Sequence, residues 1–553
     1  MSGTHEVFNQ STPRVDVDRF STHAALRDAL AQLAPALDTT RLAAIGALMG
    51  SAEMAEHARL ANTHAPQLHT HDLQGRRRDQ VEFHPSYHAL LGAALGFGLH
   101  GTPWARDAGR HAHLERAAGF MLFTECEPSV LCPVSMSYAV APALRANAAL
   151  AQAWGPKLEA TAYDPRWLPF EHKSAVTMGM GMTEKQGGSD VRANTTRAEF
   201  DGDTPWGAAY RLTGHKWFFS APMCDAHLVL AHAAGGLSCF FVPRWLPDGT
   251  VNPIRVERLK HKLGNHANAS SEVEFGGDVT GWRVGDEGRG VPLILAMGAL
   301  TRLDCALGTA GLMRAALGLA LHHARQRHAF GKRLVEHALM KNVLADLALE
   351  SEAALLLALR VAHTIDATEG GRSDPHEATM RRVLTPVAKF WICKRGAAFA
   401  QEAMECLGGN GYVEEGGHGE MARIYREMPV NSIWEGSGNI MALDLLRALR
   451  GADVAAAVAR ELDPARSAHA AFDRLAATLP PRLDGATEEA DARTLTRDLA
   501  LLMQAALLRR HSTDAVFGAF CTSRLGDGSD VFGRLPAATD FDSILERALP
   551  ADA

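Results

Sequence analysis

One run of sequence decides the fold: Tyr210-Arg211-Leu212-Thr213-Gly214-His215-Lys216-Trp217-Phe218-Phe219-Ser220. Short groups rich in aromatic and β-branched residues stand on either side of a glycine, a pattern typical of β-strands joined by turns. Similar groups follow at residues 227–230, 238–242 and 271–275, with turn signals at Gly235-Gly236 and Pro247-Asp248-Gly249. We interpret Gly214 as another break of this kind. The sequence therefore predicts an antiparallel β-domain over residues 176–290.

Helical patterns rich in alanine and leucine lie on both sides of this β-domain. Residues 1–175 contain runs such as 42–60 and 111–123, in which apolar residues recur at steps of three and four. Residues 291–450 contain longer runs, 291–327 and 334–365, typical of a four-helix bundle with a loop at 370–375. Residues 451–553 read as extra helices to about residue 520, interrupted at Pro480-Pro481, and then as a turn-rich tail. The predicted fold class is α+β, mainly α, in these four domains.

The composition of the 553 residues is that of a soluble globular protein, with 47% hydrophobic and 22% charged residues. The formal net charge of -7 gives no electrostatic reason to expect nucleic acid or an anionic membrane as the main partner. The N-terminus lacks a secretion signal, and the longest apolar stretch, residues 90–99, is too short to cross a bilayer. We therefore expect a cytoplasmic protein with no membrane partner.

The cysteines and histidines predict neither a redox motif nor a metal site. The eight cysteines include no C-x-x-C pair, so buried thiols in a reducing compartment are the simplest interpretation. None of the 26 histidines stands in H-E-x-x-H or a similar ligand spacing.

A candidate base lies in Asn431-Ser432-Ile433-Trp434-Glu435-Gly436-Ser437-Gly438. Glu435 stands beside an aromatic ring and ahead of a glycine-containing turn, in a segment with few other ionisable groups. Partial burial there would remove the water that weakens a carboxylate as a base. For this motif taken alone, a solvated loop glutamate is an equally good interpretation.

Two motifs in the β-domain offer surfaces for a cofactor. Residues 179–190, G-M-G-M-T-E-K-Q-G-G-S-D, combine glycines with two hydroxyls, an arrangement that lets backbone N–H groups converge on an anion. This is neither G-x-G-x-x-G nor a P-loop, and a plain turn explains it as often. Residues 217–220, W-F-F-S, set flat apolar rings next to a hydroxyl, a surface suited to a flavin ring or to core packing.

Two further motifs end helices of the predicted bundle. Residues 327–332, R-H-A-F-G-K, combine a cation, a ring and a glycine, which suit either a helix cap or a pyrophosphate-adenine group. Residues 406–411, C-L-G-G-N-G, place three glycines where a helix ends. Glycines there either admit a ligand close to the backbone or stop the helix.

Taken in order, these motifs resemble the acyl-CoA dehydrogenase flavoprotein family. The shared patterns are T-E-x-x-x-G-S-D, G-x-K-x-F-F-S, R-x-x-F-G, L-G-G-N-G and W-E-G-S, and the resemblance covers about residues 5–450. Their full wording is similar to the AidB-like subgroup, which is associated with the adaptive response to alkylation stress. The resemblance implies a helical domain, a β-domain and a four-helix bundle, with non-covalent FAD between the last two, in a homotetramer.

The resemblance also implies roles for single residues. Glu435 is expected to remove the α-proton of an acyl thioester while the β-hydride moves to flavin N5, and Arg302 is expected near this base. An ordinary ion pair of Arg302, for example with Asp304, is equally compatible with the sequence. Arg327 and Phe330 are implied to reach the FAD of a neighbouring subunit. The residues implied to bind FAD are Met182, Thr183, Gly188, Ser189, Phe218, Phe219, Ser220, Arg327, Phe330, Leu407, Gly408, Gly409, Gly411 and Ser437.

The chain departs from the family pattern in three places. Trp434 stands where most relatives have tyrosine, so we expect a reshaped acyl pocket. Ala338 and Glu405 replace glutamines that contact FAD in many relatives. Residues 451–553 have no counterpart in ordinary acyl-CoA dehydrogenases.

The AidB-like subgroup is linked to double-stranded DNA through a basic C-terminal region. Here residues 451–553 hold eleven arginines and no lysine against sixteen acidic residues, so their net charge opposes duplex binding. A local stripe remains open, because Arg493, Arg497, Arg509 and Arg510 fall where one helix face can carry them. The other interpretation is a solvated face that packs the extra domain onto the protein.

The function predicted from the sequence is that of an FAD-dependent oxidoreductase acting on CH–CH groups of acyl-CoA or a related small molecule. The alternative is a DNA-associated stress flavoprotein with vestigial dehydrogenase activity. A third reading, an oxidase of the nitroalkane type, shares the fold but usually carries Asp as its base, where this chain has Glu435.

Overall fold

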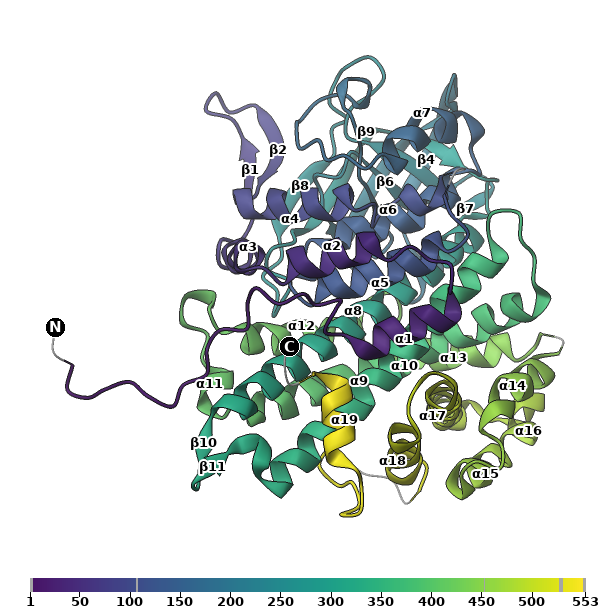
Figure 1. Ribbon diagram of the computed structural model, residues 1–553. Helices are drawn as coiled ribbons and strands as arrows, with labels where there is room; N and C mark the ends of the chain where they lie inside the picture. The colour runs from purple at the N-terminus through teal and green to yellow at the C-terminus, as the bar shows by residue number, and fades with distance from the viewer. Residues whose placement is uncertain (1–2, 106–107, 452, 527–530, 551–553) are drawn as a thin grey trace. The chain divides into compact units, whose positions relative to one another are not determined.

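The computed structural model describes residues 3–105, 108–451, 453–526 and 531–550 (Figure 1). The fold is α+β and mainly α, as predicted. Contacts between Cα atoms group the chain into two compact units, which we describe separately. The helical unit comprises residues 1–55, 113–126 and 305–553, and the sheet unit comprises residues 56–112 and 127–304. The predicted bundle and the segment after it thus fall within a single unit.

The sheet unit is built around seven strands. They are β3 (Met178–Gly181), β4 (Arg197–Thr204), β5 (Gly207–Ser220), β6 (Ala226–Ala233), β7 (Gly236–Pro243), β8 (Arg255–Leu259) and β9 (Ser270–Val284). Their order is β3-β6-β4-β5-β9-β7, β8 lies on β9, and β7 also pairs with β6, so the sheet curls back on itself. Most pairs are antiparallel, as predicted, but β3 and β4 run parallel to β6.

The break predicted at Gly214 is wrong, because β5 runs straight through this residue and pairs with β9. Gly214 has a φ of +147°, and a side chain there would come within 2.6 Å of the Thr196 hydroxyl. The glycine is needed for this close approach inside a strand, not for a turn.

Alternate side chains of these strands form the core of the sheet unit. Phe219, Phe240 and Val273 are fully or almost fully buried in one cluster. Helices α4 (Pro85–Gly96), α6 (Leu131–Leu144) and α7 (Ala148–Glu159), most of α3 (Ala52–Thr63), the first part of α8 (Gly290–Gln326) and one hairpin also belong to this unit. That hairpin, β1 (Gln67–His71) with β2 (Arg77–Glu82), adds two strands to residues 1–175, where only helical runs were predicted.

The helical unit holds the predicted bundle. Its helices are α1 (Ala24–Leu33), α2 (Thr40–Met49), α5 (Ala112–Thr124), the second half of α8 (Gly290–Gln326), α9 (Ala338–Thr368), α10 (Pro375–Cys406), α11 (Gly409–Tyr412), α12 (Glu420–Asn431) and α13 (Gly438–Ala448). The loop predicted at 370–375 is confirmed. Pro375 starts α10, and the Asp374 carboxylate caps it by accepting hydrogen bonds from two backbone N–H groups.

Residues 451–553, which we call the extension, add more helices to the same unit. They are α14 (Val454–Leu462), α15 (Ala470–Ala476), α16 (Leu479–Pro481), α17 (Ala492–His511), α18 (Asp514–Arg524) and α19 (Phe541–Ala548). Helix α19 lies in the tail for which only turns were predicted, so that prediction is incomplete. Both α17 and α19 pack on α9, and α17 also packs on α10 (Figure 1).

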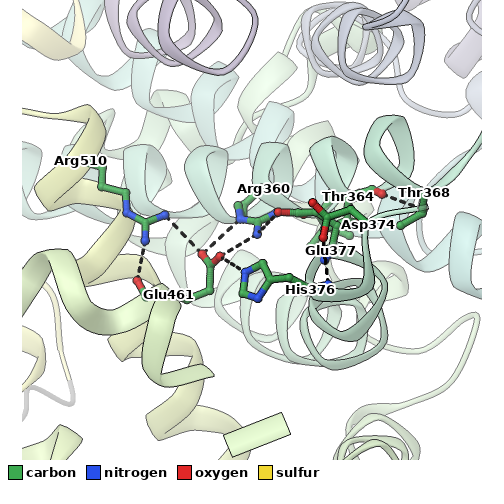
Figure 2. A network of polar contacts seen from close by, with 9 residues as sticks. Arg360, Thr364, Thr368, Asp374, His376, Glu377, Glu461 and Arg510 are labelled. Carbon is green, nitrogen blue, oxygen red and sulfur yellow. Dashed lines mark hydrogen bonds and ion pairs between the residues drawn. The ribbon is translucent and has the colours of Figure 1, made fainter. Parts of the chain in front are cut away.

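A network of charged side chains fastens the extension to the bundle (Figure 2). Arg360 on α9 donates to the Glu377 carboxylate at 2.7 and 3.0 Å and to the Glu461 carboxylate of α14 at 2.8 and 3.3 Å. His376 lies 2.9 Å from Glu461, and Arg510 donates to the Glu461 carbonyl. Burial alone raises the pKa of Glu461, but the bonds from Arg360 and His376 outweigh it and lower the pKa to about 2.

A second set of ion pairs lies along α9. Arg524 of α18 contacts Asp346 at 2.5 Å and Glu350 at 3.2 Å, and both carboxylates are buried. Arg547 of α19 contacts Glu352 at 2.9 Å and Asp28 at 2.6 Å. The extension is therefore an integral part of the helical unit.

Helix α8 is the one described helix that is long and apolar enough to cross a membrane by length and composition. More than half of its most apolar window is buried inside the protein. This burial is what a core helix of a globular protein shows, and such helices meet the same length and composition criterion.

Candidate active site

The candidate base lies in a tight turn between two helices of the helical unit. Helix α12 ends at Asn431, and α13 begins at Gly438. The backbone N–H groups of Ile433 and Trp434 donate to the Val430 carbonyl and close the end of α12. Glu435 follows with a left-handed φ of +58° and is half-buried. A non-glycine residue holds this conformation only when its surroundings enforce it.

The indole of Trp434 adds a buried donor beside this base. Its Nε1 is buried and has no hydrogen-bond partner among the described residues. Buried N–H groups are almost always paired, so this one is a donor that a ligand or water could use. The indole nitrogens of Trp154, Trp245 and Trp391 are unpaired in the same way among the described residues. If the tyrosine implied by the resemblance is usual here, Trp434 offers an indole N–H in place of a phenolic hydroxyl.

The turn rests on α10. The Lys389 side chain is 1% exposed, and its ammonium donates to the carbonyl oxygen of Gly436, the residue after Glu435. Gly436 has a φ of +106°, and a side chain there would collide with Met441 of α13. The sequence motifs did not include Lys389, because it precedes Glu435 by 46 residues in the interior of a helix.

The glycine loop after α10 divides into an open half and a packed half. Leu407 caps α10, and Gly408 follows with a φ of +59°. Gly408 and Gly409 are exposed, with open space where side chains would stand. Gly411 is buried, and a side chain there would lie 2.4 Å from the Met404 carbonyl. The open half leaves backbone accessible to a ligand, whereas Gly411 serves packing.

Phe330 stands at the tip of a small hairpin. Strands β10 (His328–Ala329) and β11 (Lys332–Arg333) pair around Phe330 and Gly331, whose φ angles of +50° and +81° match a type I′ turn. The Phe330 ring is 97% exposed. Asparagine and glycine favour this position, so a bulky aromatic residue here stands in an unfavourable backbone conformation.

The N-terminal segment connects this hairpin to the glycine loop. The Arg327 guanidinium donates to the Asn9 carbonyl, and the Asn9 side chain bonds the backbone N–H and carbonyl of His328. The amide of Gln10 accepts a bond of 3.4 Å from Asn410. Two predicted cofactor motifs thus lie near each other, joined by residues that carried no signal in the sequence.

In the sheet unit, the aromatic motif splits between two faces of β5. Phe218 is 49% exposed and Ser220 is half-buried, on the same side of the strand. Phe219 points the other way and is fully buried, with its ring stacked on His227 at 4.0 Å. The ring and hydroxyl available to a cofactor are therefore those of Phe218 and Ser220.

The loop of residues 182–190 lies against the same strand. The Thr183 carbonyl accepts a hydrogen bond of 2.8 Å from the Trp217 N–H, which places the loop beside Phe218. A side chain at Gly188 would come within 2.4 Å of the Thr183 hydroxyl. Met182 and Thr183 are half-buried, and Gly188 and Ser189 are exposed. The predicted residues of the sheet unit thus gather in one place.

A buried ion pair that sequence reasoning missed holds this loop. The Lys216 ammonium lies 2.7 Å from the Glu184 carboxylate, and both side chains are fully buried. Glu184 also accepts from the Thr195 and Thr196 backbones and hydroxyls. Burial opposes ionisation of Glu184, but Lys216 and these bonds hold its pKa well below the usual range. Glu184 and Lys216 both stand inside the motifs described above, but nothing in the sequence indicated that they form an ion pair.

Arg302 is 9% exposed on the part of α8 that belongs to the sheet unit, whereas Glu435 belongs to the helical unit. Its neighbour Thr301 is buried, and the Thr301 hydroxyl donates to the Gly298 carbonyl at 3.2 Å.

Three family models match the chain in succession. The N-terminal domain of the adaptive response protein AidB matches residues 9–165, the middle domain of acyl-CoA dehydrogenases matches 179–277, and their C-terminal domain matches 288–450. AidB of Escherichia coli (strain K12), named only provisionally as an acyl-CoA dehydrogenase, is 48% identical over 94% of both chains. The chain belongs to the acyl-CoA dehydrogenase family, in its AidB-like subgroup.

Other proteins are similar to this chain over most of its length. Acyl-CoA dehydrogenase family member 11 of Caenorhabditis elegans is 30% identical over 80% of this chain and 72% of its own. A solved structure named Bd2924 apo-form has a TM-score of 0.83 at 30% identity and covers 92% of this chain and 100% of its own. The Caenorhabditis elegans ACDH-11 structure in complex with C11-CoA has a TM-score of 0.82 at 26% identity, covering 96% of this chain and 95% of its own.

The arginines of the AidB-like extension bind partners within the helical unit. Arg497 contacts Asp498 at 2.7 Å, Arg509 contacts Asp514 at 2.6 Å, and Arg510 belongs to the network of Figure 2. Arg493 donates to the Asn439 side chain at 3.0 Å. The arginines considered for a DNA-binding stripe thus serve internal contacts.

One cluster in the described residues has the atoms of a metal site. His376, Glu377 and Glu461 bring ligand atoms within 4.8 Å of one another. The Arg360 guanidinium already donates to both carboxylates and supplies the positive charge that a metal ion would bring (Figure 2). The cluster is therefore built as an ion-pair network.

Proposed function

We propose that the protein is an FAD-dependent oxidoreductase that removes two hydrogens from adjacent carbons of an acyl-CoA thioester. The observation that carries this proposal is the turn of Glu435, a half-buried residue in a left-handed backbone next to Trp434, whose indole N–H has no partner among the described residues. Membership of the family and the C11-CoA complex of ACDH-11 support the choice of substrate.

The residues present fit an FAD cofactor. In the sheet unit, the exposed Phe218 ring offers a flat surface, and the Ser220 hydroxyl on the same face offers a donor. In the helical unit, the open backbone of Gly408 and Gly409 admits close approach of a ligand, and Ser437 is exposed at the start of α13. An isoalloxazine ring, a pyrophosphate and a ribityl chain require these kinds of groups.

In the proposed reaction, Glu435 accepts the α-proton of the thioester as the β-hydride leaves. FAD, when bound, supplies the acceptor for that hydride and its electron pair. The α-proton is a weak acid, so donors aimed at the thioester carbonyl lower the barrier by stabilising the developing enolate. The product is the 2,3-unsaturated thioester, and the proton remains on the Glu435 carboxyl group.

We further propose a homotetramer in which Phe330 contacts the FAD of a neighbouring subunit. Its support is the 97% exposure of an aromatic ring on a strained turn. The protein's compartment is proposed to be the cytoplasm, since all eight cysteines are unpaired thiols. The DNA-associated alternative gains no support from the arginines of the extension, which contact groups of the protein itself.

The test begins with the purified protein, which should be yellow and should bleach under anaerobic conditions with an acyl-CoA, C11-CoA being tried first because the ACDH-11 structure holds it. Glu435→Gln should slow this reduction by about 10²–10⁴-fold, because the amide cannot accept the proton. The exposed Glu415 provides a matched control, and Glu415→Gln should reduce at the original rate. An unchanged rate in Glu435→Gln would show that Glu435 is not the base.

A further inference from the structure

Lys389 is a buried cation whose hydrogen bond goes to the turn of the candidate base. Its side chain is 1% exposed in the interior of α10. Among the residues that the structure describes, it forms no ion pair, and its ammonium donates to the carbonyl oxygen of Gly436. Burying an ammonium group without a partner carboxylate costs free energy. The presence of Lys389 at this position therefore indicates a role other than ion pairing.

That hydrogen bond reaches a stretch of backbone in an unfavourable conformation. Glu435 and Gly436 have successive φ angles of +58° and +106°. Such backbone persists only when contacts on several sides fix it. On one side Gly436 packs against Met441 and Ile440 of α13, as close as 2.7 Å for an added Cβ. Lys389 supplies the contact from α10.

We propose that Lys389 is a positioning residue for Glu435. By holding the Gly436 carbonyl, it fixes the turn and so sets the direction in which the Glu435 carboxylate leaves the backbone. A displacement of about 1 Å in a reacting group is enough to slow a reaction about 10²-fold. This inference rests on the proposed role of Glu435 as the base, and its test therefore includes a measurement that needs no catalysis.

The first measurement is amide hydrogen exchange of the FAD-loaded protein. In Lys389→Met, exchange should accelerate in residues 432–441 and stay unchanged in α9 and α17. Lys389→Arg keeps a cationic donor and should restore slow exchange. Lys341→Met is the control, because Lys341 is a cation of the same unit that pairs with Asp542 far along the chain. Unchanged exchange at 432–441 in Lys389→Met overturns the anchoring role.

The second measurement is reduction of the flavin by the acyl-CoA that bleaches the unaltered protein fastest. Lys389→Met should lower kcat about 10–10²-fold with KM within about threefold, since the thioester still binds while the base is misplaced. Exchange of the substrate α-proton for deuterium from D₂O should fall by the same factor. Lys389→Arg should recover most of both rates. A rise in KM with kcat unchanged overturns the proposal.

The two measurements separate this inference from the proposed function. If no acyl-CoA reduces the flavin, the proposed function fails, while hydrogen exchange still decides whether Lys389 anchors the turn. If Glu435→Gln blocks reduction but Lys389→Met reduces at the original rate, only the positioning role fails. Should Lys389→Met not fold, Gly436→Ala disturbs the same turn from its other side, through the φ of +106°, and should give the same pattern of exchange and kcat.

Discussion

At the scale of single residues, the buried ion pair of Glu184 and Lys216 holds the loop that contains Thr183 and Ser189 in place. A buried pair adds little net stability compared with apolar residues of the same size, but removing one partner strands the other charge. The pair also explains why two charged residues stand in motifs otherwise made of glycines and rings. The main effect of the pair is to hold the loop of residues 182–190 in one backbone conformation beside β5.

We predict that Glu184→Gln destabilises the sheet unit by about 3–5 kcal/mol, because the Lys216 ammonium loses its carboxylate in a fully buried position. The measurement is the urea midpoint of the transition followed by tryptophan fluorescence, since most tryptophans belong to this unit. Glu199→Gln, at an exposed site on β4, should leave the midpoint unchanged. Equal midpoints for the two variants would contradict the prediction.

The same scale shows what the sequence determined at the site. Sequence motifs assigned Phe218, Phe219 and Ser220 alike to the cofactor, and only the structure separates the buried Phe219 from the other two. A register shift between Lys216 and Phe219 interrupts the simple alternation of side chains there. The pairing of Glu184 with Lys216 was not predictable, because it joins a loop to a strand 32 positions later. Lys389 carried no signal, since a lysine inside a helix usually lies at the surface.

At the scale of elements, the hairpin of β10 and β11 holds Phe330 in a conformation that favours asparagine or glycine. For an L-residue with a Cβ, a left-handed backbone costs about 1–2 kcal/mol. The Phe330 ring lies edge-to-face with His337 of its own chain at 6.1 Å, and we propose that it also contacts a neighbouring subunit. The stability of the helical unit and the proposed contact of the ring with a neighbouring subunit can be measured separately.

Phe330→Asn should leave the helical unit equally stable or more stable by about 1 kcal/mol, because asparagine tolerates the left-handed backbone. The same change should weaken FAD retention and tetramer formation if the ring reaches a neighbouring subunit. Thermal unfolding gives the first quantity, and gel filtration with the ratio of flavin to protein absorbance gives the others. Full flavin content in a tetrameric Phe330→Asn protein would refute the role of the ring.

The network around Arg360 predicts how docking of α14 depends on pH. The folded-state pKa of Glu461 is lowered from 4.5 to about 2, so its stabilising effect is complete above about pH 4.5 and is lost as the pH falls toward 2. Amide exchange in residues 454–462, corrected for the intrinsic rate, should accelerate between pH 4.5 and 3. Glu461→Gln should show fast exchange at both values, and a pH dependence as steep as that of the unaltered protein would exclude Glu461 as its source.

Elements also differed in how far sequence could predict them. Helices α8 and α9 were placed within a few residues because their apolar period is long and their alanine and leucine content high. The limits of α10 followed only from the loop predicted at 370–375 and the glycines at 408–411. The hairpin of β1 and β2 was not predicted because its strands are polar and do not alternate between apolar and polar residues. One example is Gln67-Leu68-His69-Thr70-His71. Helix α19 was not predicted because it is only eight residues long and follows a glycine-rich stretch.

At the scale of the whole molecule, the extension is built into the helical unit by arginines that reach α9. The contacts of Arg524 with Asp346 and Glu350 are buried, whereas the contact of Arg509 with Asp514 is exposed. Fold class and family followed from the order of motifs, but the grouping of residues 1–55, 113–126 and 305–553 into one unit did not. It depends on contacts between segments hundreds of residues apart, which local patterns do not encode.

These two arginines give a matched pair of variants. Arg524→Ala should destabilise the helical unit by about 3–5 kcal/mol, because two carboxylates remain buried without this partner. Arg509→Ala should cost at most about 1 kcal/mol, since its pair is solvated. Differential scanning calorimetry compares the two, and similar shifts in unfolding temperature would show that the extension is only loosely attached.

The contact of Arg547 with Asp28 spans 519 positions of the chain. At synthesis speeds of about 5–20 residues per second, the first helix leaves the ribosome roughly half a minute to two minutes before the last one. During that interval the surfaces that α17 and α19 later cover are open to water and to other nascent chains. Newly made copies of this protein should therefore depend on chaperone protection, and stalled or shortened chains should be prime substrates for degradation.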